Sequence, residues 1–147
     1  MNDLRETLSD RVHQAPLAAA LGFEAVSAEK GRAAMRVPWR ADAVGEAGSD
    51  IIAGGVVTSL IDHVAGMAVA TARGEPGAIA TIDMRIDYLR PAGPRLGVTA
   101  SAHCYRLTRH IAFVRAEAHD GEGETPVATA QLAFMINSPG PPMGSAT

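Results

Sequence analysis

The sequence predicts an α+β fold in which a curved antiparallel β-sheet wraps around one long central helix. Segments with strand character form a hairpin before a long apolar stretch and an uninterrupted run of long strands after it. A run of strands without intervening helices is typical of an antiparallel sheet with a helix packed on it. The apolar stretch has hydrophobic side chains on nearly all sides, so its helix needs burial on more than one side, which a curved sheet provides.

Two short helices are expected near the N-terminus. Residues 3–12 are polar with spaced leucines, which indicates an amphipathic helix. Residues 16–21 predict a second helix, since Pro16 stands at an early helical position and Gly22 stands near its end.

A hairpin, a loop and the central helix follow in that order. Residues 23–29 and 32–39 predict paired strands, because a Lys-Gly turn separates them and the side chains of the second segment alternate. Residues 41–50 lack periodicity and contain two glycines, so we expect a loop there. The long helix is expected over 54–72, before a segment rich in turn residues.

Three or four strands are expected to complete the domain, because breaks rich in turn residues separate the remaining apolar segments. We expect a single domain over 1–137 and a disordered tail over 138–147, where proline, glycine and small residues dominate. The expected strands cover 78–89, 96–107, 110–119 and 126–136.

Composition narrows the class of protein. A chain of 147 residues has the size of one domain, and its net charge of −3 argues against a nucleic-acid binder. Cys104 is the single cysteine, which excludes an internal disulfide, and no metal site is implied. The N-terminus has no apolar signal core, and Asp62 and His63 interrupt the longest apolar stretch, so we expect a cytoplasmic protein without a membrane partner.

Asp62 is the most informative polar residue. It lies in the middle of the apolar helix, where an unpaired carboxylate is costly to bury. A carboxylate there suits general-base catalysis or direct attack on a carbonyl, and a structural aspartate satisfied by hydroxyls is the equally weighted alternative. His63 points about 100° away from Asp62 on a helix, so we interpret it as a packing or interface histidine. Cys104 has no neighbouring base in the sequence and is interpreted as structural.

Gly54 and Gly55 mark the start of the long helix. Glycine lets another group approach the backbone closely, and the free N–H groups at a helix start favour negative charge beside them. These N–H groups can therefore form an oxyanion hole for a carbonyl. A tight turn into the helix is the structural alternative.

Two runs of the sequence resemble a known family. Residues 53–62 read AGGVVTSLID and resemble the helix-start motif of hotdog-fold acyl-CoA thioesterases of the phenylacetate-degradation (PaaI-like) type. Residues 80–92 read ATIDMRIDYLRPA and resemble the strand that follows this helix in the same family, and Ile-Ala-Phe at 111–113 also fits. The resemblance covers residues 21–136.

The resemblance implies the hotdog fold and hydrolysis of a fatty or aromatic acyl-CoA thioester to free acid and CoA. Because CoA is part of the substrate, no cofactor is implied. Carried over by position, Asp62 is the general base or nucleophile, the Gly54 N–H with Gly55 beside it binds the carbonyl oxygen, and Thr81 is a hydroxyl residue that helps to place water. The family also implies two-fold homodimers, often paired into homotetramers.

The chain departs from the family pattern at two positions. Ala53 stands where the family commonly has histidine, and Ala47 stands where a polar residue is often found. Ser49, Asp50 and Thr58 are the polar residues that can take over these roles. A non-catalytic acyl-CoA-binding module is therefore the alternative function. A hotdog hydratase or dehydratase ranks third, because that chemistry generally wants a histidine and a carboxylate in one site.

Helix geometry predicts a site that spans two subunits. Asp62 lies eight residues after Gly54, which is about 12 Å along a helix. A carbonyl oxygen bound at the Gly54 N–H lies about 3 Å from its donor, so the carboxylate should come from another protomer.

Coenzyme A carries several phosphates, for which arginine is a good bidentate partner. Simple solvation at the surface is the alternative for each basic residue. The candidates for CoA binding are Arg90, Arg106, Arg109 and His110.

Overall fold

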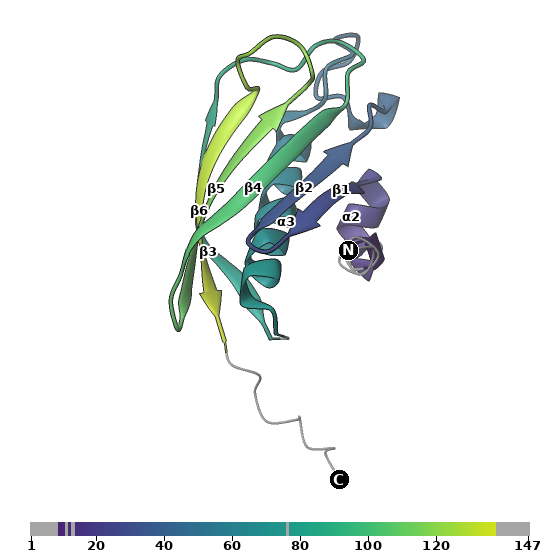
Figure 1. Ribbon diagram of the computed structural model, residues 1–147. Coiled ribbons are helices and arrows are strands. Elements are labelled where there is room, and N and C mark those ends of the chain that lie inside the picture. Colours follow the sequence, from purple (N-terminus) through teal and green to yellow (C-terminus); the bar gives the residue numbers. More distant parts are fainter. Residues whose placement is uncertain (1–8, 11, 13, 76, 138–147) are drawn as a thin grey trace.

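The computed structural model describes residues 9–137 except 11, 13 and 76 (Figure 1). The expected tail 138–147 and most of the expected helix 3–12 lie outside the described residues. The elements along the chain are α2 (Pro16–Leu21), β1 (Glu24–Glu29), β2 (Arg32–Val37), the 3-10 helix η1 (Ala41–Ala43), α3 (Gly54–Arg73), β3 (Ile79–Tyr88), β4 (Val98–Leu107), β5 (Ile111–His119) and β6 (Ala128–Ile136).

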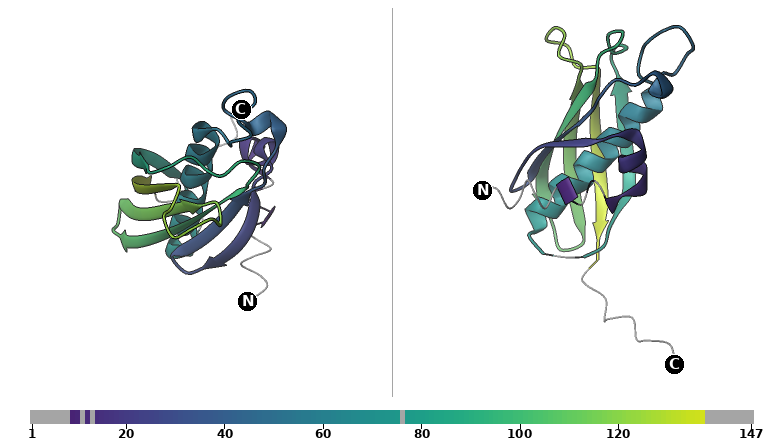
Figure 2. Two further views of the ribbon diagram at one scale, coloured as in Figure 1. Left: turned by 90° about the horizontal axis from the view of Figure 1, so that it is seen from above. Right: turned by 90° about the vertical axis from the view of Figure 1, so that its right-hand side faces the viewer.

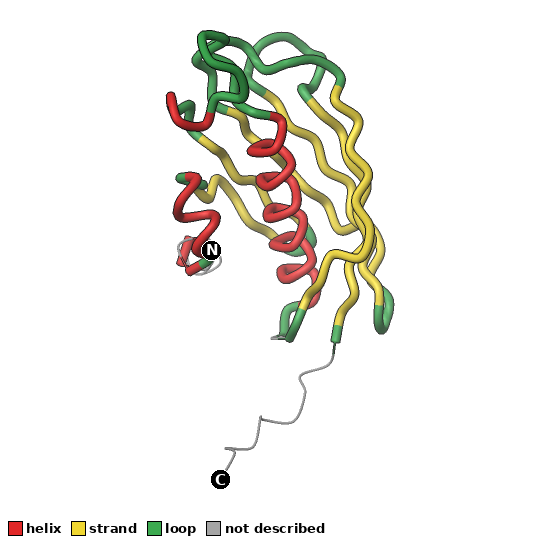
Figure 3. The backbone as a smooth tube through the Cα atoms, turned by 180° about the vertical axis from the view of Figure 1, so that it is seen from behind, coloured by secondary structure: helices red, strands yellow, loops and turns green. Residues whose placement is uncertain are grey.

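The sheet has six strands in the order β1-β2-β4-β5-β6-β3, and every neighbouring pair is antiparallel. It curves around α3, which lies against one face of the sheet (Figures 1 and 3). The predicted α+β architecture, a curved antiparallel sheet wrapped around one long helix, is therefore confirmed. The boundaries differ from the expected ones by one or two residues, and η1 forms inside the expected loop 41–50.

Helix α2 begins and ends at the residues that its sequence indicates. Pro16 stands at the start of the helix, where the missing N–H costs no hydrogen bond. Gly22 adopts a left-handed conformation with φ of 73°, and its N–H donates to the carbonyls of Ala18 and Ala19. This short helix precedes β1 directly and contacts α3 (Figure 2).

The hairpin of β1 and β2 is tied to two other elements at its turn. Gly31 has φ of 78°, a conformation that favours glycine. Its N–H donates to the Thr71 hydroxyl at 3.0 Å, and its carbonyl accepts from the Cys104 N–H at 2.8 Å. One glycine therefore connects the turn to α3 and to β4.

Helix α3 forms the centre of the hydrophobic core. Leu60, Ile61, Val64 and Val69 are fully buried, which accounts for the apolar pattern that predicted the helix. The helix ends at Gly74, whose φ is 70° and whose N–H donates to the Ala70 carbonyl. By length and composition alone α3 could cross a membrane, but here it packs on a sheet as the core helix of the domain.

Strand β3 lies at one edge of the sheet. It pairs with β6, and among the described residues no strand pairs with its other edge. A register shift between Thr81 and Asp83 leaves Ile82 half exposed at this edge. An open strand edge of ten residues with an exposed isoleucine is suited to pairing with another chain.

Candidate active site

The start of α3 presents free backbone N–H groups. Ala53, the residue before the helix, has φ of −58° and ψ of 139° and makes no side-chain hydrogen bond to it. The N–H groups of Val56 and Val57 donate back to the Ala53 carbonyl, whereas those of Gly54 and Gly55 meet no acceptor among the described residues. Because a helix start carries partial positive charge, these two N–H groups can bind an oxyanion.

Both glycines are open to an incoming group. A Cβ on Gly55 would meet no atom within 4 Å, and on Gly54 it would meet only the Tyr88 ring, at 3.6 Å. Neither glycine has a positive φ, so the backbone conformation itself does not require glycine. Access to the N–H groups is therefore the physical reason for the paired glycines.

Two hydroxyl groups hold the first turn of the helix in place. The Tyr88 hydroxyl donates to the Gly54 carbonyl at 2.7 Å, the Thr58 hydroxyl donates to the same oxygen at 3.0 Å, and the two hydroxyls contact each other. The Gly54 carbonyl and the Gly55 N–H belong to one peptide group, and hydrogen bonds to the carbonyl polarise that group and strengthen its N–H as a donor. Tyr88 is therefore a positioning residue of the helix start.

A hollow of about 280 Å³ lies in front of this helix start. Ala53 lines it where the family commonly has histidine. Of the polar residues that could replace that histidine, Ser49 donates its hydroxyl to the Glu46 carbonyl, and the Asp50 carboxylate pairs with Arg95 at 3.0 Å. Thr58, joined to Tyr88, is the one of the three that touches the first turn of α3.

Asp62 lies in the middle of α3 and is held by a neighbouring strand. The Thr81 hydroxyl, on β3, donates to Asp62 Oδ1 at 2.7 Å. No hydrogen-bond partner for Oδ2 occurs within the part of the chain that the structure describes. Asp62 is half-buried rather than buried, because the sheet of its own chain leaves this side of the helix uncovered. One oxygen is thus anchored while the other can accept a proton or attack a carbonyl.

A second hollow, of about 270 Å³, lies beside Asp62 and Thr81. His63 lines it too, with its ring tilted against Phe23 at 6.1 Å between ring centres. Burial lowers the pKa of His63, and the charge of Asp62 opposes that shift only in part. Its Nε2 is buried and finds no partner among the described residues, so His63 is a neutral packing side chain here.

The two hollows are separate half-sites. Gly54 and Tyr88 line the first, Asp62 and Thr81 line the second, and the two hollows share no lining residue. Helix α3 and strand β3 run in opposite directions. The bonded pair Gly54–Tyr88 therefore lies at one height along α3, and the bonded pair Asp62–Thr81 lies at another. One chain therefore does not bring the predicted oxyanion hole and the predicted carboxylate together.

Arg90 is held firmly by the protein itself. Its guanidinium binds both carboxylate oxygens of Asp120, at 2.7 and 2.8 Å, and also donates to the carbonyls of Glu122 and Thr125. The Asp120 side chain is fully buried and accepts the Gly93 N–H as well. These contacts hold the pKa of Asp120 far below its usual range, the hydrogen bonds from Arg90 being the main cause. Arg90 lines the hollow at Gly54, but most of its donors are already bound.

The other three basic candidates lie at the far end of the sheet. Arg106 is the second-last residue of β4, and Arg109 and His110 lie in the turn to β5, all three exposed. The His110 carbonyl accepts the Ile136 N–H at 2.8 Å, and Ile136 pairs with Ile79, which lines the hollow at Asp62. The basic turn therefore lies at the same end of the sheet as the Asp62 hollow, with β6 between His110 and Ile79.

Cys104 is buried, and burial raises the pKa of its thiol. Its sulfur donates only to the Arg106 carbonyl, at 3.7 Å. Among the described residues no group of three or more His, Cys, Asp or Glu side chains could hold a metal ion.

Similarity to known sequences identifies the family of this chain. Residues 50–127 match the family model of the thioesterase superfamily. The chain is 30% identical over 139 residues to the medium/long-chain acyl-CoA thioesterase YigI of Escherichia coli strain K12, and this match covers 85% of the chain and 88% of YigI.

Solved structures share the fold. A mutant of the phenylacetic acid degradation protein PaaI from Thermus thermophilus matches with a TM-score of 0.71 at 29% identity, covering 82% of this chain and 97% of PaaI. The PaaI protein of Escherichia coli has a TM-score of 0.79 at 20% identity over 93% of this chain and 96% of its own, a likeness of fold alone. The predicted PaaI-like hotdog fold is confirmed, and the chain belongs to the thioesterase superfamily.

Proposed function

We propose that this thioester hydrolase cleaves acyl-CoA to free acid and CoA, with Asp62 as general base or nucleophile and the Gly54 N–H as oxyanion hole. The observation that carries the proposal is the Asp62 carboxylate, which has one oxygen anchored by Thr81 and the other open to a hollow. The free N–H groups of Gly54 and Gly55 supply the complementary half-site. The relatives named as medium/long-chain acyl-CoA thioesterases support the substrate class.

The chemistry follows from these groups. The thioester carbonyl oxygen accepts hydrogen bonds from the N–H groups of Gly54 and Gly55, which stabilise the negative charge that develops during attack. Asp62 takes a proton from a water that the Thr81 hydroxyl helps to place, and the hydroxide attacks the carbonyl carbon. Collapse of the tetrahedral intermediate breaks the C–S bond, and the proton on Asp62 passes to the leaving CoA sulfur. Direct attack by Asp62 through an anhydride is the nucleophilic variant.

A homodimer is required to complete this site. A two-fold axis normal to the sheet, lying beside the open edge of β3 at the level of Arg85, would pair the open edges of two β3 strands in antiparallel fashion. Because of the register shift, Thr81 and Tyr88 lie three paired positions on either side of Arg85. Residues at equal distances from the axis then lie opposite each other, so Tyr88 faces the partner's Thr81. Gly54 is bonded to Tyr88 and Asp62 to Thr81, so the axis brings each oxyanion hole to the partner's carboxylate.

The basic residues divide between the two half-sites. We assign CoA phosphate binding chiefly to Arg106, Arg109 and His110, which are exposed at the same end of the sheet as the Asp62 hollow. Arg90 belongs to the Gly54 half-site. Because Asp120 and loop carbonyls occupy most of its donors, we expect it to shape the wall of the CoA site and to add positive charge there.

A non-catalytic acyl-CoA-binding module is the second candidate. The observation in its favour is the apolar wall that Ala53 gives to the Gly54 hollow. Such a module would keep the oxyanion contacts for binding while lacking turnover.

Thiol release from an acyl-CoA panel tests the proposal. The panel spans short, medium, long and aryl-acetyl chains, with wild type, Asp62→Asn and Asp83→Asn compared. Asp83 lies on the same strand as Thr81 but outside both hollows. We expect Asp62→Asn to lower kcat by about 10²- to 10⁴-fold and Asp83→Asn to retain activity. Tight acyl-CoA binding without turnover by the wild type would decide for the binding module, and full activity in Asp62→Asn would exclude Asp62 as the base.

A further inference from the structure

Two residues beside the Gly54 half-site hold a costly backbone conformation. Among the described residues, Asp50 and Arg95 alone combine a side chain with a positive φ, at 56° and 59°. This left-handed conformation is uncommon for residues other than glycine and persists only where surrounding contacts hold it. Neither residue lines the hollow at Gly54, but Asp50 directly precedes residues 51–53, which do, and Arg95 lies shortly after Ala92, which also does. Both costly positions therefore flank the half-site.

Asp50 and Arg95 bind each other and Trp39, and we call these three residues the clasp. The Asp50 carbonyl accepts the Arg95 N–H at 2.8 Å and the Trp39 indole N–H at 2.7 Å. The Asp50 carboxylate accepts a second bond from Arg95 Nε at 3.0 Å, and the Arg95 guanidinium lies 5.7 Å from the centre of the Trp39 ring. These contacts engage the backbone and the side chain of Asp50 together, which accounts for its left-handed conformation.

The clasp joins two segments that line the Gly54 hollow. One segment covers residues 45–53 and the other covers residues 88–92. The second segment is fixed independently, because the buried carboxylate of Asp120 binds Arg90 and also accepts the Gly93 N–H. The clasp reaches from inside the first segment to the loop that continues the second. It therefore ties the first segment to one that is already held in place.

The segment that leads into α3 depends on the clasp for its hydrogen bonds to the rest of the protein. The Ala53 N–H donates to the Ala43 carbonyl at 2.9 Å, so this bond stays close to the loop. Among the described residues, every hydrogen bond from 44–53 to a residue outside 40–57 is made by Asp50. Because Ala53 makes no side-chain cap to the helix, the clasp controls how the chain enters α3.

We propose that Asp50 and Arg95 are positioning residues of the oxyanion hole. The clasp holds the segment before α3 in place and thereby fixes the direction of the Gly54 N–H, although neither residue touches the substrate. The inference rests on the proposed function, because it gives the clasp a part in the same thioester hydrolysis. It also explains how a polar side chain at position 50 serves the half-site without lining its hollow.

Asp50→Gly separates positioning from stability. Glycine adopts a φ of 56° without steric cost, and the ion pair that it removes is 41% exposed at Asp50 and 72% exposed at Arg95, so it contributes little to stability. The melting temperature should therefore stay within about 3 °C of the wild-type value. Because the helix start is no longer held, kcat for thiol release should fall about tenfold, while KM should change by less than about twofold.

An amide rescue and a matched control accompany this variant. Asparagine tolerates the left-handed conformation and its amide oxygen can accept from Arg95 Nε, so Asp50→Asn should keep at least about half of the wild-type kcat. Asp42→Gly breaks an exposed ion pair with Arg40 in the same loop and should leave kcat unaltered. An unchanged kcat in Asp50→Gly would overturn the proposal, and so would a fall in kcat that a lower melting temperature accompanies.

Hydrogen exchange followed by mass spectrometry tests the clasp without turnover. The N–H groups of Gly45 and Ala53 are hydrogen-bonded within the loop and exchange only when it opens. In Asp50→Gly and in Arg95→Gln, exchange over residues 44–53 should be at least about tenfold faster than in the wild type. Unchanged exchange in both variants would show that the clasp does not hold this segment, whatever the activity of the enzyme.

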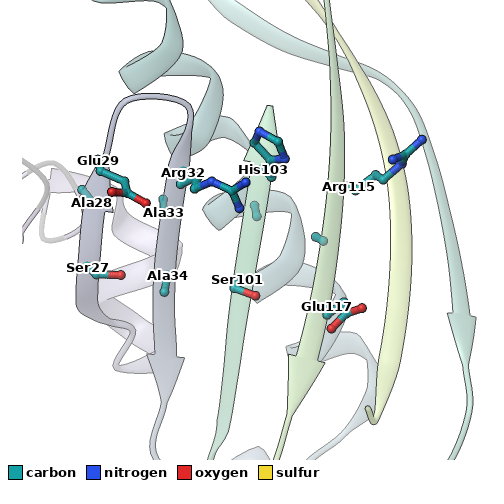
Figure 4. Close-up of a pocket in the computed structure, with 12 residues that line it drawn as sticks. Ser27, Ala28, Glu29, Arg32, Ala33, Ala34, Ser101, His103, Arg115 and Glu117 are labelled. Carbon is teal, nitrogen blue, oxygen red and sulfur yellow. The ribbon is translucent and has the colours of Figure 1, made fainter. Parts of the chain in front are cut away.

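Arg32→Gln is the matched control for Arg95→Gln. Arg32 is exposed and lines a larger hollow, of about 600 Å³, that shares no lining residue with the Gly54 hollow (Figure 4). Its variant also removes one arginine charge but should leave exchange over residues 44–53 and kcat unaltered.

The two measurements separate the possible failures. Faster exchange over residues 44–53 with a wild-type kcat would show that the clasp orders the loop without positioning the oxyanion hole, which overturns the proposal. If the wild type hydrolysed no acyl-CoA, the positioning role would fall with the proposed function. The exchange rates would then still show whether Asp50 and Arg95 hold the loop.

Discussion

At the scale of single residues, two hydroxyl groups determine the chemistry of the half-sites. Thr81 fixes one oxygen of Asp62 at 2.7 Å and leaves the other open. Tyr88 binds the Gly54 carbonyl at 2.7 Å and thereby polarises the peptide group that carries the Gly55 N–H. In the proposed mechanism, each hydroxyl acts on a group that contacts the thioester.

Tyr88→Phe should lower kcat by about tenfold while KM changes by less than about twofold. The substitution keeps the ring that packs on Gly54 and removes the hydroxyl that orients its peptide group. The loss should therefore appear in the transition state, where charge develops on the carbonyl oxygen, rather than in substrate binding. Steady-state kinetics of thiol release measure both constants.

Tyr105→Phe is the matched control for this prediction. Tyr105 lies under the Arg115 guanidinium, far from the helix start in sequence, and its variant should keep both constants. Equal falls in kcat for the two variants would point to a general loss of structure, and an unchanged kcat in Tyr88→Phe would remove Tyr88 from the site.

The sequence predicted the half-site residues that lie in local motifs and missed those that depend on distant contacts. Gly54 and Asp62 stand in one helical run, so their positions follow from periodicity and chemistry. Tyr88 reaches Gly54 across 34 positions, and Asp120 reaches Arg90 across 30. Strand alternation places Tyr88 on the same face of β3 as Met84 and Ile86, which pack against the core. This alternation was the available sequence signal that Tyr88 lies on the α3 side of the sheet.

At the scale of elements, one ion pair joins the two loops beside the Gly54 half-site. Arg90 follows β3, and Asp120 follows β5. The buried carboxylate accepts both the guanidinium and the Gly93 and Glu122 N–H groups, so it organises both loops at once. The wall of the hollow at Gly54 therefore depends on Asp120, which does not itself line the hollow.

Asp120→Asn should lower the free energy of unfolding by about 2–4 kcal/mol at pH 7. The folded-state pKa of Asp120 is depressed, chiefly by hydrogen bonds from Arg90. Its contribution to stability is therefore complete above the unfolded-state pKa of about 3.9 and is lost as the pH falls from there toward the folded-state value. The difference between wild type and variant should shrink as urea unfolding is repeated from pH 5 down to pH 3.

Glu124→Gln serves as the control for acid sensitivity, because Glu124 is exposed in the same loop. Its unfolding free energy should follow the wild-type curve at every pH. A difference between Asp120→Asn and wild type that stays constant with falling pH would show that the ion pair does not carry the stability of these loops.

The elements themselves were predictable because their patterns are local. Strand alternation and the apolar helix gave boundaries within one or two residues. The burial of Asp62 was not predictable in the same way, since the expected burial on several sides of α3 is incomplete in a single chain. The position of β3 at the edge of the sheet also depends on its long-range pairing with β6, which no local sequence pattern encodes.

At the scale of the whole molecule, the separation of the half-sites makes catalysis a property of the assembly in the proposed mechanism. One chain holds Gly54 with Tyr88 and, at another level of α3, Asp62 with Thr81. Pairing of the β3 edges would join each half to the complementary half of the partner.

Mixing two inactive variants should restore activity. Gly54→Pro removes the N–H donor, and proline fits the first helical position after Ala53, whose ψ of 139° suits the residue before a proline. Asp62→Asn removes the base. Refolding the two variants together at equal amounts should give about a quarter of wild-type activity, because half of the dimers are mixed and each has one intact site.

Each variant refolded alone is the control and should stay inactive. If both groups acted within one chain, no mixture would contain an intact site, and the mixed sample would remain as inactive as its components. Size-exclusion chromatography of the mixed sample confirms that dimers formed before activity is measured.

The distance between the two half-sites along α3 has a kinetic consequence for the enzyme in the cell. In the proposed mechanism, a newly synthesised chain carries every catalytic group and yet hydrolyses nothing until it meets a second chain. At low abundance the rate of hydrolysis would then grow with the square of enzyme concentration instead of in proportion to it. In that mechanism the strand edge would set a threshold of expression below which the cellular pool of activated acids is spared.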